Sequence, residues 1–201
     1  MQYLIYGSKD FAIILRGFLE YHQMSFAGFI DDFSTGDGII GSFSDVILKY
    51  NPDEYEIVLG VGYTNLEARL QIYNKIKSAG FTIATLIHEK AYVRSPANIG
   101  EGSIVMAQAC VDCNAVLEDV TVLWPGVVVN HDSRVGRNSF LSPNSTICGF
   151  VTIGENTFVG AGAVIVDHLE IPSGSFVKAG SLYAGKESGS CQPLDLPERA
   201  D

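Results

Sequence analysis

Residues 123–153 read LWPGVV VNHDSR VGRNSF LSPNST ICGFVT I when the chain is broken after every sixth residue. Each block begins with an aliphatic residue, and the same spacing continues on both sides. The positions in phase, sixteen in a row, are Ile87, Val93, Ile99, Val105, Val111, Leu117, Leu123, Val129, Val135, Leu141, Ile147, Ile153, Val159, Ile165, Ile171 and Val177. A strict period of this length indicates a repeat architecture and not an ordinary apolar run.

A second phase of the repeat, three residues after the aliphatic one, is rich in Gly and Asn. These residues are Gly102, Asn114, Gly126, Asn138, Asn144, Asn156, Gly162, Gly174 and Gly180. Both types adopt left-handed backbone angles at little cost, which a corner every six residues requires. The sequence therefore predicts a triangular prism of short parallel strands with about 18 residues per coil. The aliphatic residues point inward, and residues 87–182 supply about five coils.

The first half of the chain has a different pattern, in which apolar strands alternate with helices. We expect strands at 2–6, 25–30, 55–61 and 81–87, and helices at 9–22 and 65–79. Residues 36–41 read as a loop, and Ser44 as the cap of a short helix. The apolar face expected for the first helix is Phe11, Ile14, Leu15, Phe18 and Leu19. This alternation predicts a small, parallel, Rossmann-like sheet over residues 1–86, followed by the repeat domain at 87–183 and a tail at 184–201.

Ligands of parallel α/β sheets bind at the carboxyl ends of the strands. Those ends here are residues 7–9, 31–32 and 60–62. The dinucleotide fingerprint G-x-G-x-x-G does not follow the first strand, which argues against such a cofactor. Asp31 and Asp32 could accept hydrogen bonds from ribose hydroxyls or a base N–H, or could belong to a solvated turn or helix cap.

Composition excludes several classes of protein. Lys and Arg number 13 against 23 Asp and Glu, so the formal charge is −10. That balance argues against binding to nucleic acid or to an anionic membrane surface. No apolar run approaches the roughly 20 residues of a membrane span, and the N-terminus does not resemble a signal peptide. Four cysteines without a framework spacing suggest reduced thiols and a cytoplasmic protein.

Several short motifs in phase with the two halves carry a family resemblance. They are residues 28–32 (GFIDD), 86–88 (LIH), 129–132 (VNHD), 153–155 (IGE) and 160–163 (GAGA), together with Gly62, Arg69 and Gly149. With them, the chain resembles bacterial sugar acetyltransferases of the hexapeptide-repeat superfamily, related to sialic-acid O-acetyltransferases and nucleotide-amino-sugar N-acetyltransferases. The resemblance implies a left-handed parallel β-helix, acetyl-CoA as co-substrate, no metal, and a homotrimer with active sites between subunits.

The same resemblance implies roles for individual residues. His131 would be the general base of direct acetyl transfer, Asp132 would raise its basicity, and Gly149, one coil later, would leave room for a thioester. The residues implied for the nucleotide-sugar acceptor are Gly7, Ser8, Lys9, Asp31, Asp32 and Gly62. The residues implied for acetyl-CoA are Phe140, Gly149, Ala161, Lys178, Ala179 and Gly180.

The chain departs from this family at two of these places. Residues 8–12 (SKDFA) replace a Gly-His-Gly type of loop, and Phe140 stands where some relatives have a second histidine. The expected function is N-acetylation of a nucleotide-linked amino-deoxy sugar for bacterial surface glycan biosynthesis. The alternatives are O-acetylation of a sugar such as sialic acid, a non-catalytic trimeric scaffold, and a metal-dependent lyase that needs three converging histidines. His168, at a later corner, could line a groove.

Overall fold

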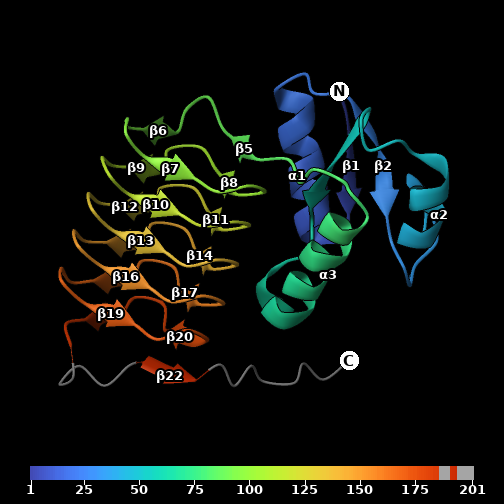
Figure 1. Cartoon of the computed structure of the whole chain (residues 1–201). Coiled ribbons are helices and arrows are strands. Elements are labelled where there is room, and N and C mark those ends of the chain that lie inside the picture. Colours follow the sequence, from blue (N-terminus) through green and yellow to red (C-terminus); the bar gives the residue numbers. More distant parts are fainter. Residues whose placement is uncertain (186–190, 194–201) are drawn as a thin grey trace. The chain divides into compact units, whose positions relative to one another are not determined.

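The computed structural model describes residues 1–185 and the backbone of residues 191–193. The chain forms two compact units, and the boundary between them lies between Thr85 and Leu86. The first unit is an α/β sheet with helices, and the second is a stack of coils, which Figure 1 shows in green to orange. Of the expected tail, residues 186–190 and 194–201 lie outside the described part of the chain.

The sheet of the first unit is parallel and has the strand order β3-β2-β1-β4. Its strands are β1 (Gln2–Tyr6), β2 (Phe26–Ile30), β3 (Ile39–Gly41) and β4 (Tyr55–Leu59). The last three residues of β1, β2 and β4 are buried, so the middle of the sheet forms part of the core. This order is the beginning of the one found in doubly wound nucleotide-binding folds.

The helices of the first unit are α1 (Asp10–Tyr21), α2 (Phe43–Lys49) and α3 (Leu66–Ser78), with the 3-10 turn η1 (Tyr63–Asn65) before α3. The buried face of α1 is Phe11, Ala12, Leu15, Phe18 and Leu19. The prediction was wrong for Ile14, which is exposed. On a helix of 3.6 residues per turn, Ala12 lies closer than Ile14 to the middle of this stripe.

Three further predictions for the first unit need correction. The expected loop at 36–41 contains β3, because Phe29 and Ile30 offer it a free sheet edge. Ser42, and not Ser44, caps α2: the N–H of Asp45 donates to the Ser42 side chain, and the N–H of Ser42 donates to Asp45 Oδ2. The expected strand at 81–87 is divided, since Ile83 forms only an isolated bridge with Ile57, whereas Leu86 already belongs to the coils.

The second unit is a parallel β-solenoid of about five turns with three faces, which we name after their first strands. The β5 face contains β5 (Leu86–Ile87), β8 (Ile104–Val105), β11 (Val122–Leu123), β14 (Phe140–Leu141), β17 (Phe158–Val159), β20 (Ser175–Val177) and the antiparallel β22 (Cys191–Pro193). The β6 face contains β6 (Tyr92–Val93), β9 (Cys110–Val111), β12 (Val128–Val129), β15 (Thr146–Ile147), β18 (Val164–Ile165) and β21 (Leu182–Tyr183). The β7 face contains β7 (Asn98–Ile99), β10 (Val116–Leu117), β13 (Arg134–Val135), β16 (Thr152–Ile153) and β19 (Glu170–Ile171).

The period of six is confirmed by the core of the solenoid. From Val105 to Val177, each aliphatic residue in phase is buried inside the prism, whereas Ile87 in the first strand, β5, is exposed. Partners in adjacent coils are 18 residues apart, as Val129 and Ile147 are. Each coil therefore rests on the next through the same short parallel ladder.

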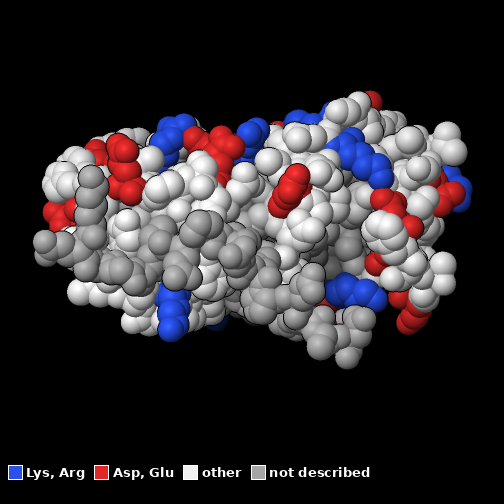
Figure 2. All heavy atoms as spheres, turned by 90° about the horizontal axis from the view of Figure 1, so that it is seen from below, with Lys and Arg blue, Asp and Glu red and all other residues white. Residues whose placement is uncertain are grey.

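None of the helices in the described part of the chain is long and apolar enough to cross a membrane. On the face seen in Figure 2, the Lys and Arg side chains of the described residues stand apart or beside Asp and Glu.

Candidate active site

Three edges of the prism carry its turns, and each edge joins two faces. The β6–β7 edge consists of residues 94–97, 112–115, 130–133, 148–151 and 166–169. The β5–β6 edge consists of residues 88–91, 106–109, 124–127, 142–145, 160–163 and 178–181. The β7–β5 edge consists of residues 100–103, 118–121, 136–139, 154–157 and 172–174. His131 and Asp132 lie on the β6–β7 edge, between β12 and β13.

The imidazole of His131 is oriented by the residue that follows it. Its Nδ1 lies 3.0 Å from Oδ2 of Asp132, and the side chain is 46 % exposed. When Nδ1 carries the proton and donates it to the carboxylate, the lone pair of the neutral ring is on Nε2. Such a histidine can accept a proton at Nε2 from a bound molecule.

Asp132 is itself held in place by the preceding coil. Its backbone is left-handed at φ 56°, and its Oδ1 accepts a hydrogen bond of 2.9 Å from Nδ2 of Asn114. Hydrogen bonds from Asn114 and then from His131 lower the pKa of Asp132, which keeps the carboxylate ionised. Asn114 was not among the predicted site residues, although the spacing of 18 residues places it beside Asp132.

A second carboxylate on the same edge was also missed. Asp112 accepts a hydrogen bond from the N–H of Cys113 and forms an ion pair of 3.2 Å with Arg94. The backbone hydrogen bond is the largest influence on Asp112; with smaller contributions from Arg94 and His131 it lowers the pKa of that carboxyl despite some burial. The edge that carries His131 thus holds two carboxylates, Asp112 and Asp132, in adjacent coils.

Gly149 lies directly beneath the imidazole. A Cβ atom at this position would be 2.8 Å from Cε1 and 2.9 Å from Nε2 of His131. The imidazole ring itself therefore occupies the space beside Gly149 that was expected to be open for a thioester. Glycine is needed here because any side chain would displace the ring.

The residues predicted to bind acetyl-CoA do not form one surface within the chain. Ala161, Lys178, Ala179 and Gly180 share the β5–β6 edge in the last two coils, whereas Gly149 lies on the β6–β7 edge. Phe140 belongs to the β5 face and is only 1 % exposed, with its ring stacked against Phe158. The role of Phe140 in binding acetyl-CoA stays a prediction.

The predicted acceptor residues of the first unit do lie together, at the carboxyl ends of β1 and β2. The hydroxyl of Ser8 donates to Oδ2 of Asp31, and Oδ1 of Asp31 accepts the backbone N–H groups of Phe33 and Ser34 at 2.9 and 2.8 Å. Burial raises the pKa of Asp31, but these hydrogen bonds outweigh it and lower the pKa. The carboxylate therefore holds the turn that follows β2.

Asp32 is more completely engaged by the protein. Its Oδ2 accepts hydrogen bonds from the hydroxyl of Tyr6 at 2.6 Å and from Nζ of Lys75 at 2.8 Å. Its Oδ1 accepts the N–H of Phe43, the first residue of α2, so the helix-cap interpretation applies. Burial raises the pKa of Asp32, yet the hydrogen bonds, led by the one from Lys75, lower it. No sequence signal pointed to Lys75, which reaches the cluster from α3.

The glycines at this end of the sheet differ in how strongly the local structure requires glycine. Gly7 has φ 108°, and a Cβ there would lie 2.9 Å from the carbonyl oxygen of Gly60. At Gly62 a Cβ would meet only Phe11, at 3.8 Å, so no steric demand selects glycine. Below Gly62, Arg69 is fully buried and donates from Nε to the carbonyl of Val61 at 3.0 Å; burial lowers its pKa to about 9.

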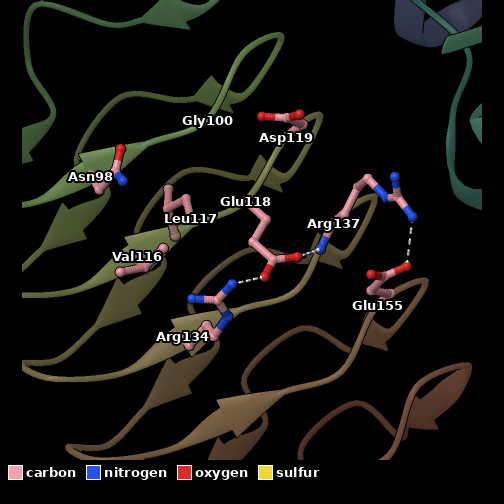
Figure 3. Close-up of a pocket in the computed structure, with 9 residues that line it drawn as sticks. All are labelled: Asn98, Gly100, Val116, Leu117, Glu118, Asp119, Arg134, Arg137 and Glu155. Carbon is pink, nitrogen blue, oxygen red and sulfur yellow. Dashed lines mark hydrogen bonds and ion pairs between the residues drawn. The ribbon is translucent and has the colours of Figure 1, made fainter. Parts of the chain in front are cut away.

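A hollow of about 450 Å³ lies on the β7 face (Figure 3). It is lined by Asn98, Gly100, Val116, Leu117, Glu118, Asp119, Arg134, Arg137 and Glu155. Arg134 pairs with Glu118, and Nη2 of Arg137 lies 3.0 Å from Oε2 of Glu155. Most of the charged side chains that line this hollow thus form ion pairs with one another. Neither His131 nor a residue predicted to bind acetyl-CoA lines it. Over the described residues, no group of three or more His, Cys, Asp or Glu side chains could hold a metal ion.

Known proteins share both the repeat and the fold. Residues 133–167 match the family described as bacterial transferase hexapeptide (six repeats). The acetyltransferase domain of PglB from Neisseria gonorrhoeae FA1090 is 26 % identical, with a TM-score of 0.83 over 96 % of this chain and 93 % of that chain. The same domain in complex with acetyl coenzyme A is 25 % identical, with a TM-score of 0.82 over 96 % and 98 % of the two chains.

A third structure shares the fold at lower identity. It is PerB from Caulobacter crescentus in complex with CoA and GDP-perosamine, at 24 % identity and a TM-score of 0.83 over 92 % of this chain and 89 % of that chain. The six-residue period, the match of residues 133–167 to the hexapeptide family and the likeness to the PglB domain together support a bacterial sugar acetyltransferase of the hexapeptide-repeat superfamily.

Proposed function

We propose that this protein transfers the acetyl group of acetyl-CoA to the amine of a nucleotide-linked amino-deoxy sugar in bacterial surface glycan biosynthesis, with His131 as the general base. The observation that carries the proposal is the geometry of His131, whose Nδ1 is 3.0 Å from Asp132 and whose Nε2 lies over Gly149. The similar PglB domain is an acetyltransferase domain, and PerB is described with CoA and GDP-perosamine.

The proposed reaction is a direct transfer within one ternary complex. The neutral amine attacks the thioester carbonyl carbon, so that a C–N bond forms as the C–S bond breaks. His131 Nε2 takes the proton that the amine loses, and this proton then passes to the departing thiolate to give CoA. Asp132 stabilises the imidazolium in between. General base catalysis of this kind contributes about 10²–10⁴-fold, and positioning of the two substrates supplies much of the remainder.

The first unit is proposed to bind the nucleotide of the acceptor. In parallel α/β sheets this ligand position lies beyond the carboxyl ends of the strands, where Ser8 and Asp31 meet. The proposed acceptor site also includes Gly7 and Lys9 on either side of Ser8, Asp32, which accepts the N–H of Phe43 at the start of α2, and Gly62 beyond β4.

Acetyl-CoA is proposed to run along the late coils of the solenoid, past Gly149 and the Ala161 to Gly180 region of the β5–β6 edge. Because these groups lie on two edges of one chain, we propose a homotrimer of left-handed solenoids, in which a neighbouring subunit completes the site. A cytoplasmic location is part of the same proposal.

The test is a thiol-release assay with acetyl-CoA and a panel of UDP-, dTDP- and GDP-linked 3-amino- and 4-amino-deoxy sugars, with free sialic acid included. The wild type, His131→Ala and the control His22→Ala are compared. We expect acceptor-dependent release that falls at least 10²-fold in His131→Ala and stays near wild type in His22→Ala, with binding of acetyl-CoA retained.

Three other outcomes would change the proposal. Full activity of His131→Ala would remove the base role. Release with sialic acid alone would make the protein an O-acetyltransferase. Failure of acetyl-CoA to bind the wild type would leave the non-catalytic scaffold.

A further inference from the structure

Phe150 occupies a position of the repeat whose backbone disfavours a large side chain. It follows Gly149 on the β6–β7 edge, and its backbone is left-handed at φ 58°. The two preceding coils have Asn114 and Asp132 in this place, with φ 59° and 56°. Asn and Asp tolerate this conformation, whereas a bulky residue adopts it at a cost. The side chain of Phe150 is 49 % exposed, so burial offsets little of that cost, and such strain is concentrated at functional positions.

The ring of Phe150 lies between two imidazoles. On one side, it is perpendicular to the ring of His131, with 5.2 Å between centroids and 85° between planes. On the other side, the ring of His168 is parallel to it, with 4.8 Å between centroids and 3° between planes. Aromatic pairs attract one another at both separations. Phe150 therefore contacts rings of the protein itself, and one of them is the proposed base.

The backbone keeps these three rings in register. The N–H of Phe150 donates to the carbonyl of His131 at 3.2 Å, and the N–H of His168 donates to the carbonyl of Gly149 at 3.1 Å. Adjacent strands are spaced by about 4.8 Å, which matches the separation of the parallel pair. His168, itself left-handed at φ 59°, thus supports Phe150 from the following coil.

The imidazole of His131 is held by few contacts of its own. The side chain is 46 % exposed, and the carboxylate of Asp132 beside its Nδ1 is 33 % exposed. A single hydrogen bond at one ring atom lets the ring swing about that bond, and water competes for the same carboxylate. Gly149 bounds the ring from beneath, because a Cβ there would lie 2.8 Å from Cε1. A further contact, away from the axis of the hydrogen bond, fixes the direction in which Nε2 points.

We propose that Phe150, supported by His168, is a positioning residue for the general base. This inference rests on the proposed function and adds the group that sets the orientation of Nε2. Phe150 confines the imidazole from the following coil, while Asp132 selects the tautomer at Nδ1. Because Phe150 acts through the base, its loss should slow the transfer step and leave the binding of both substrates unchanged. The strain at Phe150 is retained because Asn or Gly in its place would provide no ring.

The first test uses steady-state kinetics of thiol release on the full-length protein. Phe150→Gly and Phe150→Asn both suit the left-handed turn, so we expect melting temperatures close to that of the wild type. We expect kcat to fall by about 10- to 100-fold in both, while the KM values for acetyl-CoA and for the acceptor change less than about 2-fold. Phe150→Tyr keeps the ring and should restore kcat. The matched control is Gln108→Gly, which removes an exposed side chain from the corresponding left-handed position, φ 63°, of the β5–β6 edge.

The second test does not depend on activity. In protein labelled with nitrogen-15 histidine, the magnetic resonance signals of the two ring nitrogens of His131 report which of them carries the proton. His131→Ala identifies these signals among those of the 4 histidines. Above the pH at which the ring titrates, the wild type should show a protonated Nδ1 and an unprotonated Nε2. In Phe150→Gly and Phe150→Asn the two signals should move towards each other, because a ring that swings away from Asp132 exchanges between tautomers.

Several results would overturn the role of Phe150. These are an unchanged kcat or unchanged nitrogen signals in Phe150→Gly and Phe150→Asn, and a change confined to either KM. An equal loss of kcat in Phe150→Tyr or in Gln108→Gly would also overturn it, as would a loss of kcat that follows a lower melting temperature. If the wild type transfers acetyl to no sugar, the proposed function fails, and the nitrogen signals of His131 still decide whether Phe150 orients the ring.

Discussion

The two units of the chain bring polar side chains together in different ways. In the solenoid, partners are 18 residues apart: Asn114 donates to Asp132, and Arg137 pairs with Glu155. In the first unit, Lys75 reaches Asp32 across 43 residues. A contact in the solenoid can thus be inferred from the period, whereas one in the α/β unit depends on how helix and sheet pack.

The largest expected effect tests the repeated core of the solenoid. Leu141→Ala removes a fully buried side chain from the prism and should destabilise the solenoid by about 2–5 kcal/mol, because a cavity remains among its neighbours. Leu182→Ala makes the same change at an exposed position and should cost less than about 0.5 kcal/mol. The single tryptophan, Trp124, packs against this core, so its fluorescence during urea unfolding measures the solenoid. Equal effects of the two variants would contradict a core that is ordered by the period.

The second prediction separates catalysis from packing at two glycines of the solenoid. Gly149→Ala should lower kcat by about 10- to 100-fold with little loss of stability, since its Cβ would displace only the ring of His131. Gly136→Ala should instead cost about 1–3 kcal/mol, because its Cβ would lie 2.6 Å from the backbone nitrogen of Glu155. Thiol release and thermal unfolding of both variants check this. A Gly149→Ala enzyme with normal kcat would show that the ring position is not required.

The third prediction concerns the long-range cluster of the first unit. Asp32→Asn should destabilise this unit by about 1–2 kcal/mol at pH 7, because hydrogen bonds from Lys75, Tyr6 and Phe43 favour the ionised carboxylate. The pKa of Asp32 is lower in the folded protein, so its contribution is full above the ordinary value near 3.9 and is lost as the pH falls below it. The difference in melting temperature from the wild type should therefore shrink towards pH 3. The control is the exposed Asp37→Asn, which should show little effect at any pH.

The smallest expected effect tests a local feature of the same unit. Ser42→Ala should cost about 1 kcal/mol, because the hydroxyl that accepts the N–H of Asp45 and donates to Asp45 Oδ2 at the start of α2 is lost. Ser44→Ala, inside the helix and exposed, should be nearly neutral or slightly stabilising. Thermal unfolding followed by circular dichroism distinguishes the two. A larger loss of stability in Ser44→Ala than in Ser42→Ala would instead identify Ser44 as the cap of α2.

The difference between the two units also explains which parts of the fold and of the candidate site could be predicted from the sequence. The period placed the aliphatic core and put Gly149 one coil after His131. The period could not reveal that Phe140 is buried. A side chain that points outward from the prism has the same place in the repeat whether it is buried or exposed. In the first unit, the propensities of single segments located most strands and helices. They missed β3, which forms only because β2 provides an edge, and Lys75, whose partners come from other elements.

The repeated hydrogen bonds of the β6–β7 edge have a consequence for how such proteins diversify. The N–H of Asp132 donates to Cys113, that of Phe150 to His131, and that of His168 to Gly149, so each coil is fastened only to its neighbours. A duplication or deletion of 18 residues outside 112–169 would lengthen or shorten the prism by one coil and leave these groups in register. A coil outside 112–169 can therefore be added or removed while His131 keeps its neighbours.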